Sequence, residues 1–224
     1  MTKGVYVPSS IFSDEHLVPR VMIAPQRYIQ GEGVIDNIGR YITLLNARRA
    51  AVLASSRGHG AEGARIIDSL KQRNVSSVVA TFDGECSLDE VNKQVEVLKT
   101  EDIDCLIAVG GGKCVDAGKS IAYRLDLPVV IVPTLASNDA PCSALSVMYS
   151  SEGVQNDVEY YPESPALVIV DTGVVASASE RFLVAGMGDA MATWYEAKAC
   201  LANPEGRNCV GSRPTLALSL IHIS

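Results

Sequence analysis

Three consecutive glycines, Gly110–Gly112, separate an apolar run that ends at Val109 from a helical pattern that begins near Lys113. Glycine has no Cβ, so this backbone could approach a pyrophosphate closely while the N-terminus of the following helix presents free N–H groups. The motif is neither G-x-G-x-x-G nor a P-loop, because Lys113 is followed by Cys114 rather than by Ser or Thr. Glycines alone are equally compatible with a tight turn that binds nothing, but a position between strand and helix favours a phosphate site.

A second candidate lies just after the next apolar run, in the stretch from Pro133 to Tyr149. Its hydroxyl groups could bond ribose or phosphate oxygens, and the Asp139 carboxylate could hold a substrate hydroxyl. An ordinary surface loop rich in turn residues would have a similar composition. The length of the stretch without a clear helix or strand favours a functional loop.

A third candidate is Asp189, which stands among small and apolar residues in the helical stretch 185–197. A buried carboxylate is costly unless it is paired or binds a metal. Glu196 lies two turns later on the same predicted face. From composition alone, an aspartate near the start of a helix, where the helix dipole favours it, is the simpler explanation.

The elements that must position these residues follow an alternating order. Apolar, β-branched runs at 49–54, 78–82, 105–109 and 129–132 predict strands, and amphipathic patterns at 60–72, 88–100 and 113–125 predict helices. Ser87 and Glu90 form a predicted capping box before the helix with apolar stripe Val91, Val95, Val97 and Leu98. Alternation with short links predicts βαβ units on a parallel sheet.

After residue 132 the pattern changes. Two further runs, 146–150 and 166–170, predict strands that could pair as a hairpin, and the chain is helical from Ser179 onward. We therefore expect an α/β dinucleotide-binding domain at 1–176 and the beginning of a helical domain at 177–224. About 45 residues cannot easily bury a helical core, and Ser219–Ser224 loses helical polarity. These features predict a truncated or misread end of the coding sequence.

The composition limits the kinds of molecule that this protein is expected to bind. The chain has 224 residues, 47% of them hydrophobic and 20% charged, with a formal net charge of −7. This charge disfavours nucleic acid and anionic membranes, so a small molecule is the expected partner. No apolar run reaches the roughly 20 residues of a membrane helix, and no signal peptide is evident. We expect a cytoplasmic protein, with a short organellar import segment within 1–18 left open.

The six cysteines include no C-x-x-C pair. Most of them stand in apolar or small-residue contexts, so buried free thiols are expected rather than a zinc cluster.

Taken together, the three candidate segments resemble the iron-containing alcohol dehydrogenase superfamily, in particular its glycerol dehydrogenase branch. The similarity extends from about Ile23 to about Leu216 and includes Gly84–Ser87, the glycine run, Asn138–Pro141 and Gly188–Ala190. The resemblance implies a dehydroquinate synthase-like architecture, in which an N-terminal dinucleotide-binding α/β domain precedes a helical domain. It also implies a divalent metal in the cleft between the two domains.

The resemblance also implies roles for individual residues. The cofactor would be bound by Ser55, Gly111, Gly112, Lys113, Cys114, Val115 and Asp116 on its adenosine and pyrophosphate side, and by Thr134, Leu135, Ala136, Ser137, Ser143, Leu145 and Tyr149 on its nicotinamide side. Asp139 would act as the catalytic, substrate-binding carboxylate, and Asp189 as the first ligand of a zinc ion. The family's other metal ligands are histidines of the later helical domain. Because His16, His59 and His222 lack a matching context, the metal site of this chain is expected to be incomplete and the chain inactive.

Cofactor choice depends on the end of the strand at 49–54. Many family members place an acidic residue there to bind the adenosine ribose, whereas this chain has Ser55, Ser56 and Arg57. An acid would repel a 2′-phosphate, and Ser with a nearby Arg could accept one. Arg57 could equally start a solvated helix. The resemblance places NAD ahead of NADP.

The expected reaction is hydride transfer from glycerol or a related vicinal diol to NAD, with a metal polarising the alcohol and a homo-oligomer as the full-length form. One alternative is a catalytically dead nucleotide-binding fragment. Another is an elimination or cyclisation enzyme on the same scaffold, as in dehydroquinate synthase. The alcohol-dehydrogenase-like stretch 143–149 and the lack of a basic phosphate-binding cluster speak against this second alternative.

Overall fold

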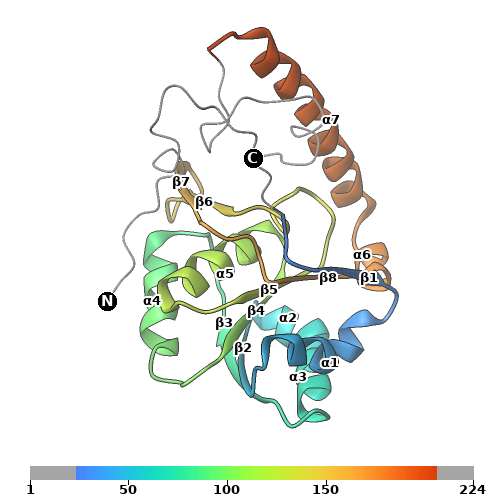
Figure 1. The fold of residues 1–224 in the computed structure, drawn as a ribbon, viewed down its shortest axis with the longest axis vertical. Coiled ribbons are helices and arrows are strands. Elements are labelled where there is room, and N and C mark those ends of the chain that lie inside the picture. The colour runs from blue at the N-terminus through green and yellow to red at the C-terminus, as the bar shows by residue number, and fades with distance from the viewer. Residues whose placement is uncertain (1–23, 206–224) are drawn as a thin grey trace.

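The computed structural model describes residues 24–205 and shows a parallel six-stranded sheet covered by helices on both faces (Figure 1). The strand order is β1-β8-β5-β4-β2-β3. The strands of this sheet are β1 (Tyr28–Gly31), β2 (Arg49–Ala54), β3 (Ser76–Thr81), β4 (Cys105–Gly110), β5 (Val129–Pro133) and β8 (Leu167–Asp171). The parallel α/β architecture expected from the alternating pattern is confirmed.

Helices and a separate hairpin complete the described structure. The short helical segments are η2 (Val34–Asn37), α1 (Ile38–Tyr41), η3 (Ile42–Leu45), α2 (Ser56–Gly58), η4 (His59–Gly63) and α6 (Thr172–Ser177). The longer helices are α3 (Ala64–Lys71), α4 (Leu88–Leu98), α5 (Gly112–Leu125) and α7 (Glu180–Ala202). The hairpin consists of the antiparallel strands β6 (Leu145–Tyr149) and β7 (Gln155–Tyr160).

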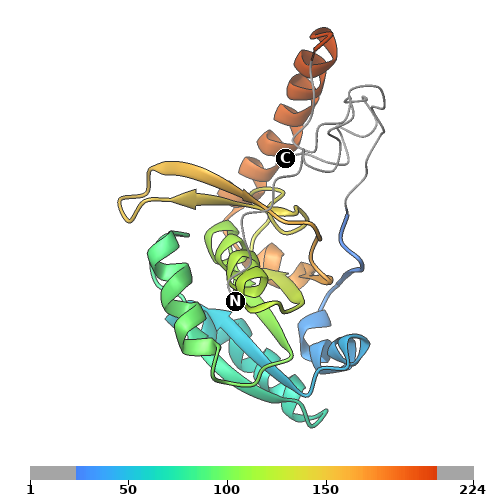
Figure 2. The same ribbon diagram turned by 60° about the vertical axis from the view of Figure 1, so that its left-hand side comes forward.

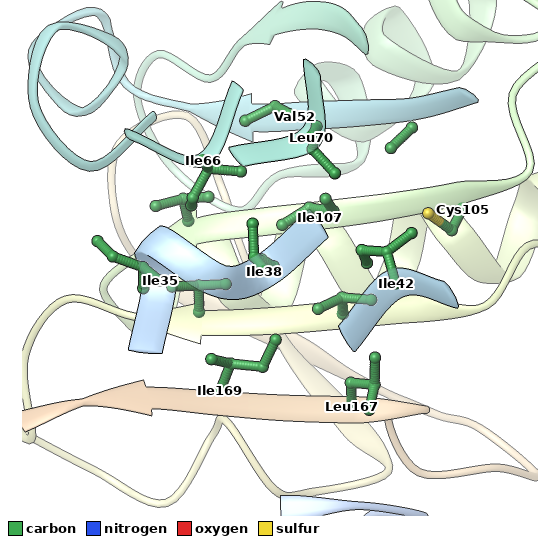
Figure 3. Packing of buried hydrophobic residues seen from close by; sticks show 14 of the residues in the cluster. Ile35, Ile38, Ile42, Val52, Ile66, Leu70, Cys105, Ile107, Leu167 and Ile169 are labelled. Carbon is green, nitrogen blue, oxygen red and sulfur yellow. The ribbon is translucent and has the colours of Figure 1, made fainter. Parts of the chain in front are cut away.

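The central strands are apolar on both faces because both faces are covered. Along β2, alternate side chains enter two different cores: Val52 packs with α1 and α3, whereas Leu53 packs with α4 and α5. Figure 3 shows the first of these cores, in which Ile38 and Ile66 lie over the sheet beside Ile107. Continuous apolar runs therefore predicted these strands correctly.

The predicted hairpin between 146–150 and 166–170 is wrong. β6 pairs instead with β7, and β8 joins the main sheet between β1 and β5. The strand β7 has the polar sequence QNDVEY, and its first three residues are exposed. It therefore lacks the apolar alternation on which a sequence-based prediction of a strand depends.

The apolar stripe predicted for α4 needs one correction. Val97 is 53% exposed, whereas Gln94 is buried and donates from Nε2 to the Thr81 carbonyl oxygen at 2.7 Å. Half of the predicted capping box is also absent. The Ser87 hydroxyl accepts from the Glu90 N–H, but the Ser87 N–H donates to the Glu85 carbonyl rather than to Glu90.

The helix α7 projects away from the sheet (Figures 1 and 2). Only Thr193 and Ala197 are buried along its 23 residues. Asp189 lies in its middle, so the explanation of this residue as a helix-start aspartate is wrong. Within residues 24–205, no helix combines the length and apolar character needed to cross a bilayer. His16, Cys209, Ser219–Ser224 and the import segment considered within 1–18 lie outside the described residues.

Candidate functional site

The order of the strands creates a switch point at which a crevice can form. From β2 the chain continues to β3 at one edge of the sheet, and then returns to place β4 on the other side of β2. Parallel sheets bind ligands at the carboxyl ends of strands at such a point. A cleft of about 1090 Å³ lies there, with Ser55 after β2, Gly111 after β4 and Thr134 after β5 in its wall.

The cleft collects most of the residues predicted for the site. Its wall includes Ser55, Gly111, Gly112, Lys113, Cys114, Asp116, Thr134, Leu135, Ser137, Asp139, Ser143, Leu145, Tyr149 and Asp189. Two predicted residues are not in the wall. Val115 is fully buried in the core, and Ala136 directs its carbonyl oxygen toward α7.

The end of the cleft at which a phosphate site was predicted is formed by the first turn of α5. Gly111 is the N-cap residue, and the N–H of Val115 donates to its carbonyl at 3.0 Å. The preceding N–H groups of Gly112, Lys113 and Cys114 have no intrahelical acceptor, which is the arrangement that binds anions. Burial raises the pKa of the Cys114 thiol to about 12, so the thiol stays protonated.

Asn138 is a cleft residue for which no role was predicted, although it belongs to the Asn138–Pro141 stretch that carries the resemblance. A Cβ on Gly112 would lie only 2.7 Å from Asn138 Nδ2, so the amide group stands directly over the first turn of α5. There it could donate to a phosphate oxygen. Lys113 forms an ion pair with Glu85 at the lip of the same cleft. Nothing in the sequence places a residue of the 134–144 loop beside the glycine turn, because this contact exists only in the folded chain.

The resemblance places the adenosine beside the residues that follow β2. The Ser55 hydroxyl accepts from the N–H of Gly58 at 3.1 Å, which makes Ser55 the N-cap of α2. Arg57 lies beside it in the cleft wall. Neither the cap nor the arginine would repel a 2′-phosphate.

The opposite end of the cleft holds two carboxylates. The N–H of Asp139 donates to Asp189 Oδ2 at 3.2 Å, which brings α7 against the 134–144 loop. Oδ2 of Asp139 is buried and has no hydrogen-bond partner. Burial, and then the Asp189 charge, raise the pKa of the Asp139 carboxyl to about 6.

This pair fits part of a metal site. Carboxylate oxygens are hard ligands that divalent cations prefer, and a cation could pair with the buried Oδ2 of Asp139, which has no hydrogen-bond partner. A catalytic zinc site usually has three protein ligands. Within residues 24–205, no three His, Cys, Asp or Glu side chains gather closely enough to bind a metal ion. The ring of His59 instead contacts the Ala80 carbonyl oxygen at 2.9 Å. The five cysteines of this part are free thiols; Cys86, Cys105 and Cys114 are buried, as expected, whereas Cys142 and Cys200 are only half-buried.

A parallel sheet of this order, with a glycine turn at its carboxyl edge, is typical of α/β domains that bind nucleotides. A sequence model of the iron-containing alcohol dehydrogenases matches residues 25–172. The chain belongs to this family, as the resemblance predicted.

Several relatives within the family are named glycerol dehydrogenase. The chain is 38% identical to glycerol dehydrogenase of Citrobacter freundii, over 91% of this chain and 56% of that protein. It is 41% identical to glycerol dehydrogenase of Thermotoga maritima, over 88% and 54%. The crystal structure of glycerol dehydrogenase from Schizosaccharomyces pombe superimposes with a TM-score of 0.80 at 34% identity, covering 90% of this chain and 50% of that one. The chain therefore spans about half the length of the curated relatives it matches.

The close approach of α7 to the loop yields a first prediction. A Cβ on Gly186 would lie 2.2 Å from the Ala136 carbonyl oxygen, whereas a Cβ on Gly188 would have no neighbour within 4 Å. Gly186→Ala should therefore destabilise the protein by about 1–3 kcal/mol through overpacking. Gly188→Ala, the matched control, should stabilise it by up to about 1 kcal/mol through helix propensity. Thermal unfolding followed by fluorescence of Trp194, the single tryptophan, tests both variants. Equal effects would show that α7 does not pack at Gly186.

A second prediction concerns pH. Because the pKa of Asp139 is raised in the folded state, to about 6, its contribution to stability is fully present below about pH 4 and is lost as the pH rises through about 6. Asp139→Asn removes this loss. The variant should unfold at a higher temperature than the unaltered chain at about pH 7.5 and at the same temperature near pH 4, without added metal. Asp68→Asn, on the exposed surface of α3, is the control. Equal stabilisation at both pH values would contradict the ionisation of Asp139 in this range.

Proposed function

We propose that this chain carries the cofactor-binding half of a polyol dehydrogenase that transfers hydride from glycerol or a related vicinal diol to NAD. The observation that carries this proposal is a single cleft that joins the N-terminus of α5 to the Asp139–Asp189 pair. Such a cleft can hold a dinucleotide with its phosphates at one end and its reactive ring near the carboxylates. Similarity to named glycerol dehydrogenases supports the substrate class.

The cofactor contacts follow from the wall of the cleft. The N–H groups of Gly112, Lys113 and Cys114 would bind the pyrophosphate, with Asn138 above them. The hydroxyls of Thr134, Ser137 and Ser143, together with Leu145 and Tyr149, would surround the nicotinamide ribose and ring. Val115, Asp116 and Ala136 would contribute mainly by holding this backbone in place.

The carboxylates would act on the alcohol. With a pKa of about 6, Asp139 is mostly ionised at neutral pH and can accept a hydrogen bond from a substrate hydroxyl. Asp189 would be a ligand of a divalent metal, for which we propose zinc. When bound, such a metal would supply Lewis-acid polarisation of the alcohol oxygen. Two hydroxyls on neighbouring carbons could then be gripped together, which favours a vicinal diol.

Cofactor choice and domain organisation are proposals of the same kind. We propose NAD as the physiological cofactor and NADP as the second candidate, because Ser55 and Arg57 leave room and charge for a 2′-phosphate. We propose that residues 1–176 form the dinucleotide-binding domain and that 177–224 begin the helical domain, since α7 buries few of its residues. A homo-oligomer is proposed for the full-length protein.

Replacement of Gly112 by valine tests the cofactor site. The side chain would displace Asn138 and block the approach of a phosphate to the first turn of α5. The dissociation constant for NADH, measured by fluorescence titration, should rise by about tenfold or more. Gly60→Val is the control, because a Cβ at Gly60 has no neighbour within 4 Å and Gly60 is outside the cleft wall. An unchanged constant for Gly112→Val would place the phosphates elsewhere, and a parallel titration with NADPH gives the cofactor preference.

The metal proposal is tested by cation binding to the same chain. Two carboxylates without a third protein ligand should bind Mn²⁺ or Zn²⁺ more weakly than a complete zinc centre does, and glycerol turnover should be absent. Asp189→Asn should weaken this cation binding further while leaving NADH binding unchanged. Glu180→Gln, at the exposed start of α7, is the matched control. Cation binding that is equal in Asp189→Asn and in the unaltered chain, measured by Mn²⁺ electron paramagnetic resonance, would contradict the assignment of Asp189.

A further inference from the structure

Lys119 is a buried lysine that neither the cofactor nor the substrate is proposed to touch. It lies on α5, is 3% exposed, and is not in the cleft wall. Its ammonium group forms an ion pair with Asp116 Oδ1 at 2.8 Å. A buried ion pair is often no more stabilising than apolar residues of the same volume, so stability alone does not account for this lysine.

The remaining hydrogen bonds of Lys119 reach the 134–144 loop. Nζ donates to the Ala140 carbonyl oxygen at 2.8 Å, to Ser143 Oγ at 3.0 Å and to the Ser143 carbonyl oxygen at 3.5 Å. An ammonium group has three donors, and every hydrogen bond that Nζ makes goes to this loop, whereas Asp116 Oδ1 pairs with it by charge. Ala140 follows Asp139 directly, and Ala140 and Ser143 both lie in the cleft wall. Lys119 therefore fixes the turn that carries Asp139, the carboxylate proposed to bind the substrate.

Asp116 extends the connection to the hairpin. Its Oδ2 accepts from the N–H of Val147 at 3.2 Å, and its carbonyl accepts from the Ser146 hydroxyl at 2.8 Å. The Lys119–Asp116 pair thus ties α5, whose first turn is the phosphate site, to both the 139–143 turn and β6. Leu145 and Val147 of β6 line the same end of the cleft.

We propose that Lys119 is a positioning residue for the nicotinamide and diol end of the cleft, acting through Ala140 and Ser143. This inference rests on the proposed function. The phosphate end does not depend on Lys119, because the N–H groups at Gly112–Cys114 belong to the helix backbone. A change at Lys119 should leave the affinity unaltered for a ligand that occupies only the adenosine and phosphate end, such as ADP. The same change should weaken the binding of NADH.

The test compares ADP with NADH on three variants of the 224-residue chain. Lys119→Met removes the ammonium group and keeps the length of the side chain. It should weaken NADH binding by about tenfold and remove the change in nicotinamide emission on binding, while the ADP dissociation constant stays within about twofold. Lys113→Met, at the exposed first turn of α5, should weaken ADP and NADH in the same proportion.

The double variant Asp116→Asn/Lys119→Met separates positioning from stability. Lys119→Met alone leaves the Asp116 charge buried and unpaired, which destabilises the fold. The double variant removes that charge, so its unfolding temperature should return toward that of the unaltered chain while the nicotinamide signal remains lost. It also carries the comparison if the single variant does not fold.

Two results would overturn the inference alone. One is that the folded variants bind NADH with the same affinity, and the same change in nicotinamide emission, as the unaltered chain. The other is a proportional loss of ADP and NADH affinity in Lys119→Met, which would indicate general disruption. An unaltered chain that binds neither ADP nor NADH would instead overturn the proposed cofactor site, and this inference with it.

Discussion

The site depends on close backbone packing at positions without side chains. A Cβ on Gly118 would lie 2.4 Å from the Ala108 Cβ, so α5 rests directly on β4. This contact sets the height of the first turn of α5 at the carboxyl edge of the sheet. The missing Cβ also leaves room for the Asn138 amide at Gly112 and for the Ala136 carbonyl at Gly186. Three elements distant in sequence therefore meet around one cleft because glycine lets their backbones approach.

Charge is ordered along that cleft, although the net charge of the chain is negative. The N-terminus of α5 and Lys113 make one end favourable for phosphate, and Asp139 and Asp189 make the other favourable for a cation or a hydroxyl. Glu85, at the lip of the cleft, forms an ion pair with Lys113 and neutralises part of its positive charge. Local arrangement, rather than the overall charge of −7, determines what each end of the cleft can bind.

The sequence predicted the parts of the fold whose signal is local. Strands buried on both faces, such as β2 and β4, appear as continuous apolar runs, and the glycine turn between β4 and α5 is visible directly. β7 is polar, and β1 contains only four residues, so neither has a comparable pattern. Side chains whose burial depends on a distant partner were also missed. Gln94 is buried because it reaches the Thr81 carbonyl, and Asn138 faces the glycine turn only after the loop folds back.

The carboxylate pair shows why the placement of α7 is sensitive to what binds. The helix buries little of its own surface and meets the 134–144 loop through Gly186 and the hydrogen bond from the Asp139 N–H to Asp189. Burial of Asp139, and then the charge of Asp189, raise the pKa of the Asp139 carboxyl, so the two side-chain charges oppose this contact. A proton on Asp139 would offset the repulsion, as would a cation held by these carboxylates, and each would favour the docked helix. By linkage, whatever holds α7 against the loop must in turn raise the affinity of the pair for a proton or a cation.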